Sequence, residues 1–493
     1  MEKMMNKKLM FAVSSMVIAA GITFAACAQD TPPPYAPPAF ATSGDDTFDK
    51  WRLDFVSRAV NIDRKDPKII EEMLTGLTPS STVNKLNNNQ PEVLKPIGDY
   101  VASAVSQARI NDGRANYLAK TPILSELASK YGVPLEVAVA IWGMETSYGA
   151  NKGSTDVVRA LATLAYDGRR KDLGENELLA VADILKNNDA TREMLIGSWA
   201  GAMGHTQFMP SSYLKWAIDG DNDGKRNIWG DDNDALASTI NYLASVGWKA
   251  GEPWGKEVNL KDGFDYSLAD GTFHSIEYWR QNGVTDVWVS DGWQCTGSTN
   301  PSCGNGVMKT TEVPANWQAY LLVPAGAHGP KFLVGVNYKA IKHYNNSDSY
   351  ALSVGLLADQ ISGKAKLSSS FANADPLVTR TQAKELQLLL TNLGYDVGVI
   401  DGAPGAKTRV ALQNFQKSHN MVADGYPSQI ALQSIKAATG MFSSDALPDD
   451  MSQNSVDTLP TDASGNPVPI RMFGPPKTPE KTTPSKNNLN KTK

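Results

Sequence analysis

The segment Pro134-Leu-Glu-Val-Ala-Val-Ala-Ile-Trp-Gly-Met-Glu145-Thr-Ser-Tyr-Gly149 is a nearly all-apolar run that ends at an acid. Pro134 can open a helix, because the first helical position has no use for the N–H that proline lacks. Apolar side chains then cover most of the helix circumference: Val137, Ala138, Ile141, Trp142 and Met144. A helix that is apolar all round is buried, so we predict a buried helix that ends near Glu145.

Glu145 is the first candidate for chemistry. An acid at the end of a buried helix is partly desolvated, and desolvation raises the pKa of a carboxyl group. A carboxyl that keeps its proton near neutral pH can act as a general acid in the cleavage of a glycosidic bond. The alternative is a Glu that has reached solvent at a helix end and has only a structural role.

Length and composition describe a multidomain globular protein. The chain has 493 residues, which is enough for two or three domains, with 41% hydrophobic and 20% charged residues. A net charge of -5 gives no electrostatic case for a nucleic-acid partner. After the N-terminus, no stretch reaches the roughly 18 apolar residues that a membrane-spanning helix needs.

The N-terminus has the pattern of an export signal. Lys3, Lys7 and Lys8 precede the apolar run from Leu9 to Ala26. Ala26-Cys27-Ala28 fits a cleavage site that would release a soluble protein. Phe24-Ala25-Ala26-Cys27 also resembles a lipobox, although Phe24 replaces the usual Leu, and Cys27 would then carry lipid. Both routes place the chain in the periplasm, the second as an outer-membrane lipoprotein.

Two cysteines remain after that signal. Cys295 and Cys303 flank the polar loop Thr-Gly-Ser-Thr-Asn-Pro-Ser. In an oxidising compartment this spacing predicts a local disulfide, with two free thiols as the alternative.

A second motif is Gly197-Ser-Trp-Ala-Gly-Ala-Met-Gly-His-Thr-Gln207-Phe-Met-Pro-Ser-Ser-Tyr213. Its small residues let backbone approach backbone or a flat ligand. Hydrogen-bonding side chains stand among them: Ser198, Gln207, Ser211 and Tyr213. A concave site with a few polar groups suits a sugar, and a tightly packed helix–loop junction is the structural alternative.

Together the two motifs resemble the membrane-bound lytic murein transglycosylase B family, over roughly residues 48–361. The resemblance implies a lysozyme-like helical core and cleavage of the MurNAc–GlcNAc bond of peptidoglycan without water, leaving 1,6-anhydro-MurNAc ends. The expected fold class is mainly α, with a small strand-containing subdomain at about 254–336, where short alternating runs are separated by Gly and Pro.

The resemblance also assigns roles to residues. Glu145 would be the single catalytic acid and base, and no cofactor would be needed for the chemistry. The glycan cleft would be lined by four further residues: Ser198, Gln207, Asn345 and Tyr350. The sequence departs from the family at His205, where Tyr is more usual. The matching segments, Trp142–Thr146 and Gly197–Ser212, hold no second acid besides Glu145, although Asp156 or Asp167 could fold nearby.

An acidic loop follows the second motif. Asp219, Asp221 and Asp223 occupy positions 1, 3 and 5 of a calcium-loop pattern, with Gly224 at position 6. The closing Glu at position 12 is missing; Asp231, Asp232 or Asp234 could replace it, and the family resemblance favours Asp234. We expect a structural Ca²⁺ here, with a metal-free Asx-rich turn as the alternative.

The C-terminal part resembles the peptidoglycan-binding domain 1 family, through segments that include Val378–Leu390 and Thr408–Gln416. The predicted organisation has six parts: a signal peptide (1–28), a Pro-rich tether (29–46), a catalytic domain (47–363), a linker (364–375), a peptidoglycan-binding domain (376–438) and a disordered tail (439–493).

The sequence thus predicts a periplasmic peptidoglycan lytic transglycosylase. Its partners would be glycan strands and, as further candidates, proteins of cell-wall synthesis; a membrane is expected only if Cys27 is lipidated. Two rival hypotheses stay open. One is a muramidase that uses water and a second carboxylate, and the other is a non-catalytic wall-binding scaffold.

Overall fold

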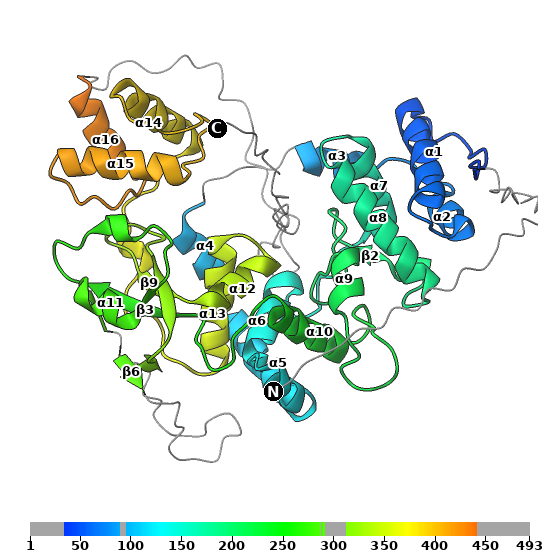
Figure 1. Cartoon of the computed structure of the whole chain (residues 1–493), viewed down its shortest axis with the longest axis horizontal. Coiled ribbons are helices and arrows are strands. Elements are labelled where there is room, and N and C mark those ends of the chain that lie inside the picture. Colours follow the sequence, from blue (N-terminus) through cyan, green and yellow to red (C-terminus); the bar gives the residue numbers. More distant parts are fainter. Residues whose placement is uncertain (1–33, 89–94, 287, 291–311, 441–493) are drawn as a thin grey trace, which may run out of the picture. The chain divides into compact units, whose positions relative to one another are not determined.

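A computed structural model describes residues 34–88, 95–286, 288–290 and 312–440 of the chain (Figure 1). Three of the predictions lie outside these residues: the signal peptide with Cys27, the Cys295–Cys303 disulfide, and the tail from residue 441. No helix within the described ranges combines the length and the apolar character that crossing a membrane requires.

The described chain up to Ser245 is mainly helical. Its helices are α1 (Asp46–Asn61), α2 (Pro67–Leu74), α3 (Ser81–Asn88), α4 (Ile97–Ala104), α5 (Gln107–Tyr131), α6 (Leu135–Thr146), α7 (Val157–Tyr166), α8 (Lys171–Lys186), α9 (Pro210–Trp216) and α10 (Asp232–Ser245). A short antiparallel pair, β1 (Thr155–Asp156) and β2 (Ile196–Gly197), joins the two sequence motifs. This pairing brings Gly197 next to the segment that follows α6.

Helix α6 is buried, as its apolar sequence predicts. Every residue from Val137 to Thr146 is buried or nearly so, and α6 packs against α5, α10 and α13 (Asp348–Ile361). Pro134 lies one position earlier than expected: it has an extended backbone and precedes the first helical residue, Leu135. The helix ends at Thr146, because the next residue, Ser147, has a left-handed backbone conformation.

The segment after α10 builds the predicted strand-containing subdomain. Its sheet has the order β4-β8-β9-β3-β5 and antiparallel neighbours. The elements are β3 (Gly255–Leu260), β4 (His274–Ser275), α11 (Ile276–Gln281), β5 (Val284–Thr285), β8 (Gln318–Leu322) and β9 (Lys331–Val334), with a separate parallel pair of β6 (Trp288–Ser290) and β7 (Glu312–Pro314). Trp279 and Trp317 are fully buried in its own core.

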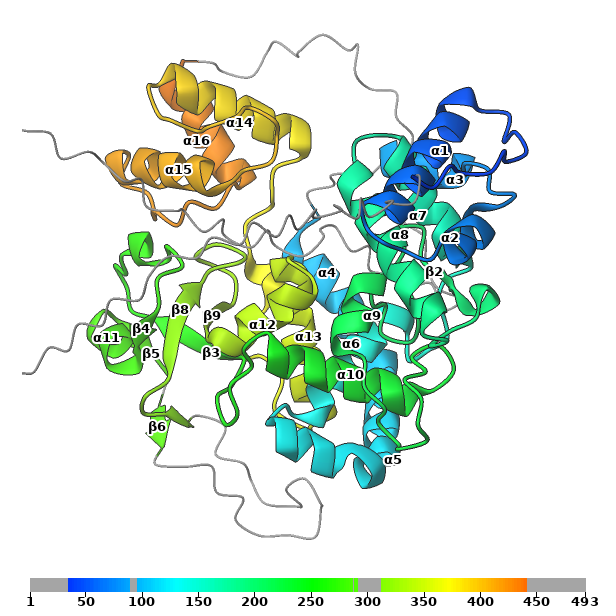
Figure 2. The same ribbon diagram turned by 45° about the vertical axis from the view of Figure 1, so that its right-hand side comes forward.

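The chain then returns to helices that close the core. Helix α12 (Val336–Tyr344) and α13 follow the sheet directly, and both lie beside it in Figures 1 and 2. Trp254 connects the two parts, since its ring centroid lies 6.2 Å from those of both Phe332 and Tyr338, in tilted contacts. Its indole Nε1 donates to Asp359 Oδ2 at the far end of α13.

A last group of three helices forms a core of its own: α14 (Arg380–Asn392), α15 (Ala406–Ser418) and α16 (Gln429–Ala438). Thr379 and Gln382 make a reciprocal capping box at the start of α14. Leu386, Leu390, Leu412 and Phe415 are buried between the helices. The fold class expected from the sequence is therefore confirmed: mainly helical, with a small antiparallel sheet and a small helical C-terminal group.

Candidate active site

Glu145 lies in the last turn of α6 and is only 3% exposed. Its Oε1 accepts a hydrogen bond of 2.8 Å from the hydroxyl of Tyr350, which is 1% exposed. Tyr350 comes from the first turn of α13, so the contact depends on the packing of α6 against α13. A buried carboxyl oriented by a hydroxyl suits an acid that must give up and take back a proton.

Tyr100, on α4, is a third member of this group that sequence reasoning missed. Burial raises the pKa of Tyr100 above its usual range, and the charge of Glu145 raises it further, while Arg109 acts in the opposite direction. Tyr100 therefore keeps its proton and offers a neutral hydroxyl near the acid. A lone tyrosine outside any motif gave no sequence signal for this role.

The turn after Glu145 is strained. Ser147 and Tyr148 both have positive φ values, 49° and 58°, although neither is glycine. The Tyr148 hydroxyl donates to the backbone carbonyl of Arg109 at 2.7 Å, which ties the turn to α5. Gly143 leaves room for the Tyr148 ring, because a Cβ there would lie 2.5 Å from the ring. Strained non-glycine residues of this kind concentrate at functional sites.

Side-chain hydrogen bonds join the second motif to this turn. Thr146 Oγ1 donates to the His205 carbonyl at 2.6 Å, and the Trp142 indole N–H donates to His205 Nδ1 at 3.2 Å. Gln207 also has a positive φ of 55°, and its side-chain amide donates to the carbonyls of Lys152 and Gly204. The structure therefore brings the two motifs together, with Gln207 buried beside the segment after Glu145.

The remaining two predicted glycan-binding residues, Ser198 and Asn345, lie in the loops that follow β2 and α12. Ser198 closes a tight loop with Ala202, both through its backbone and through its hydroxyl, which accepts from the Ala202 N–H. Asn345 caps the C-terminus of α12 and is 6% exposed, five residues before Tyr350. The preceding residue, Tyr344, donates to the carbonyl of Thr206 and so fixes α12 against the Gln207 loop.

The comparison with known proteins decides the family. The family model described as Transglycosylase SLT domain matches residues 47–359, which is more than half of the chain. The chain belongs to this transglycosylase family. A second model, described as Putative peptidoglycan binding domain, matches residues 379–434.

Individual relatives agree with this assignment. Membrane-bound lytic murein transglycosylase B of Escherichia coli strain K12 is 29% identical over 323 residues, covering 62% of this chain and 81% of that protein. SltB3 from Pseudomonas aeruginosa, solved in complex with NAG-anhNAM-pentapeptide, is 40% identical with a TM-score of 0.70, covering 80% of this chain and 100% of that chain. Soluble lytic transglycosylase SltB1 from the same organism is 28% identical with a TM-score of 0.54. The match covers 63% of this chain and 98% of that chain.

These findings confirm the family resemblance inferred from the motifs. They also confirm the function class: the chain is an enzyme, a lytic transglycosylase that acts on peptidoglycan. The wall-binding resemblance of the C-terminal helices is confirmed by the second family model.

Asp156 and Asp167, the two acids that could have joined Glu145 in this transglycosylase, have other partners. Asp156 caps α7 and forms a two-oxygen ion pair with Arg192, at 2.7 and 2.9 Å. Asp167 Oδ2 accepts from the side-chain amide of Asn87 at 2.9 Å. Both carboxylates thus hold helices together, and these contacts give no support to a role as a second catalytic acid.

His205, the departure from the family pattern, is a neutral packing residue. Burial lowers the pKa of His205, and the nearby Lys152 ammonium lowers it further, to about 4. Lys152 Nζ lies 3.3 Å from His205 Nε2 and donates to the carbonyl of Trp229. The imidazole is therefore uncharged near neutral pH and accepts from Trp142.

We predict that this neutral histidine makes the transglycosylase sensitive to acid. The unfolded chain binds a proton at His205 below about pH 6.5, whereas the folded chain does so only near pH 4, so the free energy of unfolding falls as the pH drops through this window. Because His205 is partly exposed, we expect the free energy of unfolding to fall by about 1 to 2 kcal/mol between pH 7 and pH 5. Urea unfolding at both pH values should show a smaller loss in His205→Asn than in wild type. His343→Asn, at an exposed histidine, is the control, and an identical loss in all three proteins would refute the prediction.

The close approach of Gly153 to Gly197 leads to a second prediction, about stability. An alanine Cβ at Gly153, where φ is 89°, would lie 2.1 Å from the Gly197 carbonyl oxygen. At Gly168, where φ is 81°, the same Cβ would meet nothing within 4 Å. Gly168→Ala should therefore destabilise by about 1 kcal/mol through backbone strain alone, and Gly153→Ala by at least about 3 kcal/mol. Chemical unfolding of both variants measures the difference; equal values would show that the motifs do not need this close approach.

The acidic loop holds three of its four predicted ligands together. Oxygens of Asp219, Asp221 and Asp223 lie within 4.8 Å of one another. Asp234 is 1% exposed, and its two oxygens accept from the backbone N–H groups of Gly220 and Asn227, at 2.7 and 2.6 Å. Asp234 therefore fastens the two ends of the loop. Burial raises the pKa of Asp221, and the charges of neighbouring aspartates add to this effect.

Proposed function

We propose that this lytic transglycosylase uses Glu145 as its only acid and base and converts the MurNAc–GlcNAc bond into a 1,6-anhydro-MurNAc end. The observation that carries the proposal is the buried carboxyl of Glu145 at the end of α6, hydrogen-bonded to Tyr350. A hydrolase with two carboxylates would require a second acid at a fixed distance, and Asp156 and Asp167 are engaged elsewhere.

The chemistry needs one carboxyl in two protonation states. In the first step, Glu145 gives its proton to the glycosidic oxygen as the bond from that oxygen to C1 of MurNAc breaks. In the second step, the C6 hydroxyl oxygen of the same sugar forms a bond to C1, and the Glu145 carboxylate takes the hydroxyl proton. Glu145 is thereby restored, and no water is consumed.

Tyr350 supports this cycle by positioning Glu145. Its hydroxyl holds Oε1 of Glu145, so the second carboxylate oxygen, Oε2, is kept in one orientation for the substrate. A hydrogen bond to the charged form also stabilises the carboxylate that exists between the two steps. Tyr350 would thus act on the acid itself, in addition to the glycan-lining role that the sequence predicts.

Gln207, Ser198 and Asn345 are proposed to bind the glycan. The hydrogen bonds from the Gln207 amide nitrogen to two carbonyls fix the orientation of this side chain, which leaves its carbonyl as an oriented acceptor for sugar N–H or O–H groups. Ser198 and Asn345 lie on the loops that follow β2 and α12. The complex of SltB3 with NAG-anhNAM-pentapeptide supports the same kind of ligand for this chain.

The direct test is the chemistry of the product ends. Purified peptidoglycan digested by the protein should give fragments that borohydride does not reduce, because an anhydro ring has no reducing end. Reducible ends in stoichiometric amount would indicate a muramidase, and no fragments would favour the wall-binding scaffold.

We further propose that residues 376–438 hold the enzyme on its polymeric substrate. The matched peptidoglycan-binding model supports this role, and a second binding module raises the local concentration of enzyme on a polymer. The domain limits inferred from the sequence are retained in this proposal, as is a periplasmic location, which the name of the Escherichia coli relative supports.

A structural Ca²⁺ in the acidic loop is also proposed, because three clustered carboxylates repel one another unless a cation offsets their charge. Adding Ca²⁺ to chelator-treated protein should raise the Tm by about 3 °C or more at saturating concentration. A variant with Asp219, Asp221 and Asp223 all changed to Asn should not respond, whereas Asp54→Asn, at an exposed position on α1, should respond like wild type. An unchanged Tm in wild type would favour the metal-free turn.

A further inference from the structure

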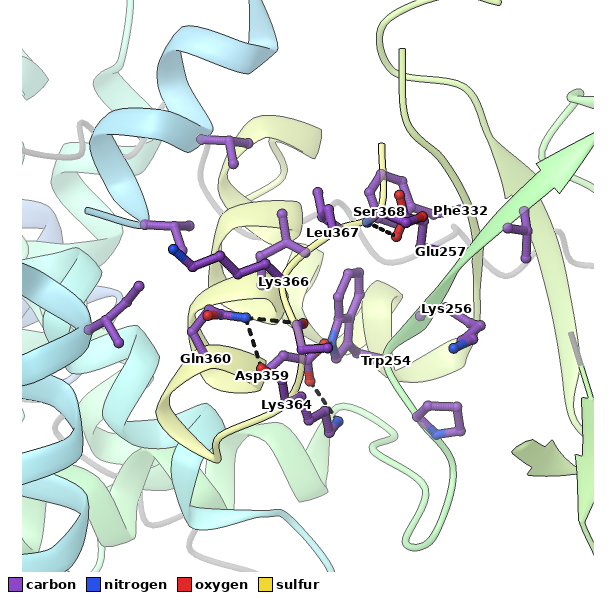
Figure 3. A pocket seen from close by; sticks show the side chains of 18 of the residues that line it. Trp254, Lys256, Glu257, Phe332, Asp359, Gln360, Lys364, Lys366, Leu367 and Ser368 are labelled. Carbon is purple, nitrogen blue, oxygen red and sulfur yellow. Dashed lines mark hydrogen bonds and ion pairs between the residues drawn. The ribbon is translucent and has the colours of Figure 1, made fainter. Parts of the chain in front are cut away.

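The segment between the two matched domains packs against the catalytic part of the chain. The first family model ends at residue 359 and the second begins at residue 379, so neither describes residues 364–375, which we call the strap. Ser368 and Ser369 donate their backbone N–H groups to the two carboxylate oxygens of Glu257, at 2.7 and 2.8 Å. Figure 3 shows Ser368 beside Glu257. The segment that the sequence predicts as a linker is therefore held in place by β3.

The beginning of the strap is fixed to the end of α13. The Lys364 ammonium pairs with Asp359 at 2.6 Å, and the side-chain amide of Gln360 donates to the carbonyls of Lys364 and Ala365, at 3.1 and 3.2 Å. Residues 364–368 then form one wall of a cavity of about 880 Å³, whose other walls include α4 and β3 (Figure 3). The strap thus leaves α13 along the side that carries α4.

The strap contacts α4 through Phe371. This half-buried residue begins the short 3-10 turn η3 (Phe371–Asn373). A Cβ placed on Gly98, in the first turn of α4, would lie only 2.7 Å from the Cβ of Phe371 and 3.3 Å from its Cγ. Gly98 has no positive φ, so its glycine provides space, and the backbone of α4 lies directly against the Phe371 side chain.

Helix α4 depends on contacts from other segments. It has eight residues, and isolated helices shorter than about 12–15 residues are marginal in water. Its N-cap residue, Pro96, makes no side-chain capping hydrogen bond. Its C-terminal end is held by Arg109, whose Nη1 donates to the carbonyls of Ser103 and Ala104 at 3.1 and 2.8 Å. Phe371 supports the opposite end, the first turn.

This first turn carries Tyr100 toward the catalytic acid. Tyr100 follows Gly98 by two residues, and the charge of Glu145 acts on its hydroxyl. Two packing contacts join α4 to the same site. Helix α4 packs against α13, whose Tyr350 holds Glu145, and Arg109 also accepts a hydrogen bond from the turn after Glu145. A shift in the first turn of α4 would therefore move the Tyr100 hydroxyl relative to the acid.

We propose that Phe371 is a positioning residue: the strap holds the first turn of α4 in place and so keeps the Tyr100 hydroxyl beside Glu145. The inference deepens the proposed function and rests on it, because it concerns the surroundings of the same acid. A hydroxyl at this place can donate to the carboxylate that forms between the two steps. Misplacement of a catalytic site by about 1 Å can cost roughly 10²-fold in rate.

The test is a double-mutant cycle in the full-length protein. Phe371→Ala, Tyr100→Phe and the double variant are compared with wild type by kcat and KM on short soluble glycan strands. Phe273→Ala is the matched control, because Phe273 is also half-buried but packs on Tyr320 of β8, with ring centroids 5.2 Å apart. In parallel, hydrogen exchange measured by mass spectrometry follows the backbone amides of α4.

Phe371→Ala and Tyr100→Phe should each lower kcat by about 10-fold with KM nearly unchanged, and Phe273→Ala should keep the wild-type kcat. If Phe371 acts through Tyr100, the double variant should lie within about two-fold of the slower single variant. Additive losses of about 100-fold, a wild-type kcat in either single variant, or an equal loss in Phe273→Ala would overturn the proposal.

Failure of the proposed function gives a different result. The value of kcat counts cut strands whatever their ends, so reducible products would refute cleavage without water and leave the cycle readable. If wild type cuts no strands, hydrogen exchange decides about the strap. Exchange of α4 about 10-fold faster in Phe371→Ala than in Phe273→Ala supports the positioning role, and equal exchange in the two variants overturns it.

Discussion

Replacing Glu145 by glutamine should lower kcat on peptidoglycan by about 10³-fold or more. Glutamine has nearly the same shape but neither gives nor takes a proton, and one general acid or base commonly contributes 10²–10⁴-fold. Here the same residue would act in both steps, so a single substitution removes both the general acid and the general base. Steady-state kinetics on soluble glycan strands measures it.

Two controls make this result specific. The Glu145→Gln side chain can still accept from the Tyr350 hydroxyl, so the Tm and the affinity for glycan should change little. Glu136→Gln removes another acid from the same helix, near its first turn, and should retain activity. Turnover close to wild type in Glu145→Gln would remove Glu145 from the mechanism.

Tyr350→Phe is the second large effect. The substitution keeps the buried ring and removes only the hydroxyl that donates to Glu145. A hydrogen bond to a charged group contributes about 1.5 to 3 kcal/mol, so kcat should fall by roughly 10- to 100-fold, with KM nearly unchanged. The pH–rate profile should also shift, because the carboxylate form of Glu145 loses its donor.

Tyr338→Phe is the matched control for this effect. The Tyr338 hydroxyl is also buried and also donates to an acid near the start of α13, Asp348, but that acid has no role in the proposed chemistry. A similar loss of kcat in both variants would mean that Tyr350 acts only through the stability of α13. A fall in Tyr350→Phe alone, with a shifted pH profile, assigns it to Glu145.

Much of the active site could be predicted because its residues lie in two continuous motifs. The buried helix α6 follows from its apolar sequence, and the glycines of the second motif allow the close approach of Gly153 to Gly197. The strands after Trp254 could also be predicted, from their short alternating runs.

The contacts that depend on distant segments could not be predicted. Tyr350 and Glu145 are 205 residues apart, and their hydrogen bond exists only because α13 packs on α6. Tyr100 belongs to no motif, yet it lies close enough for the charge of Glu145 to affect it. The strained backbone of Ser147 and Tyr148 has no sequence signature, since neither residue is a glycine. The cavity lined by Trp254 likewise takes its walls from segments far apart in the sequence, among them residues 101–110, 253–259 and 356–368.

The central claim is that one carboxyl cleaves the glycan without water, and digestion in heavy-oxygen water tests it most directly. Purified peptidoglycan is incubated with wild-type protein, and the products are analysed by mass spectrometry beside those of a hydrolytic muramidase. Cleavage by Glu145 without water should give fragments that are lighter than the hydrolytic ones by one water, carry no heavy oxygen, and are absent with Glu145→Gln. Fragments that carry one heavy oxygen at a reducing end would contradict it.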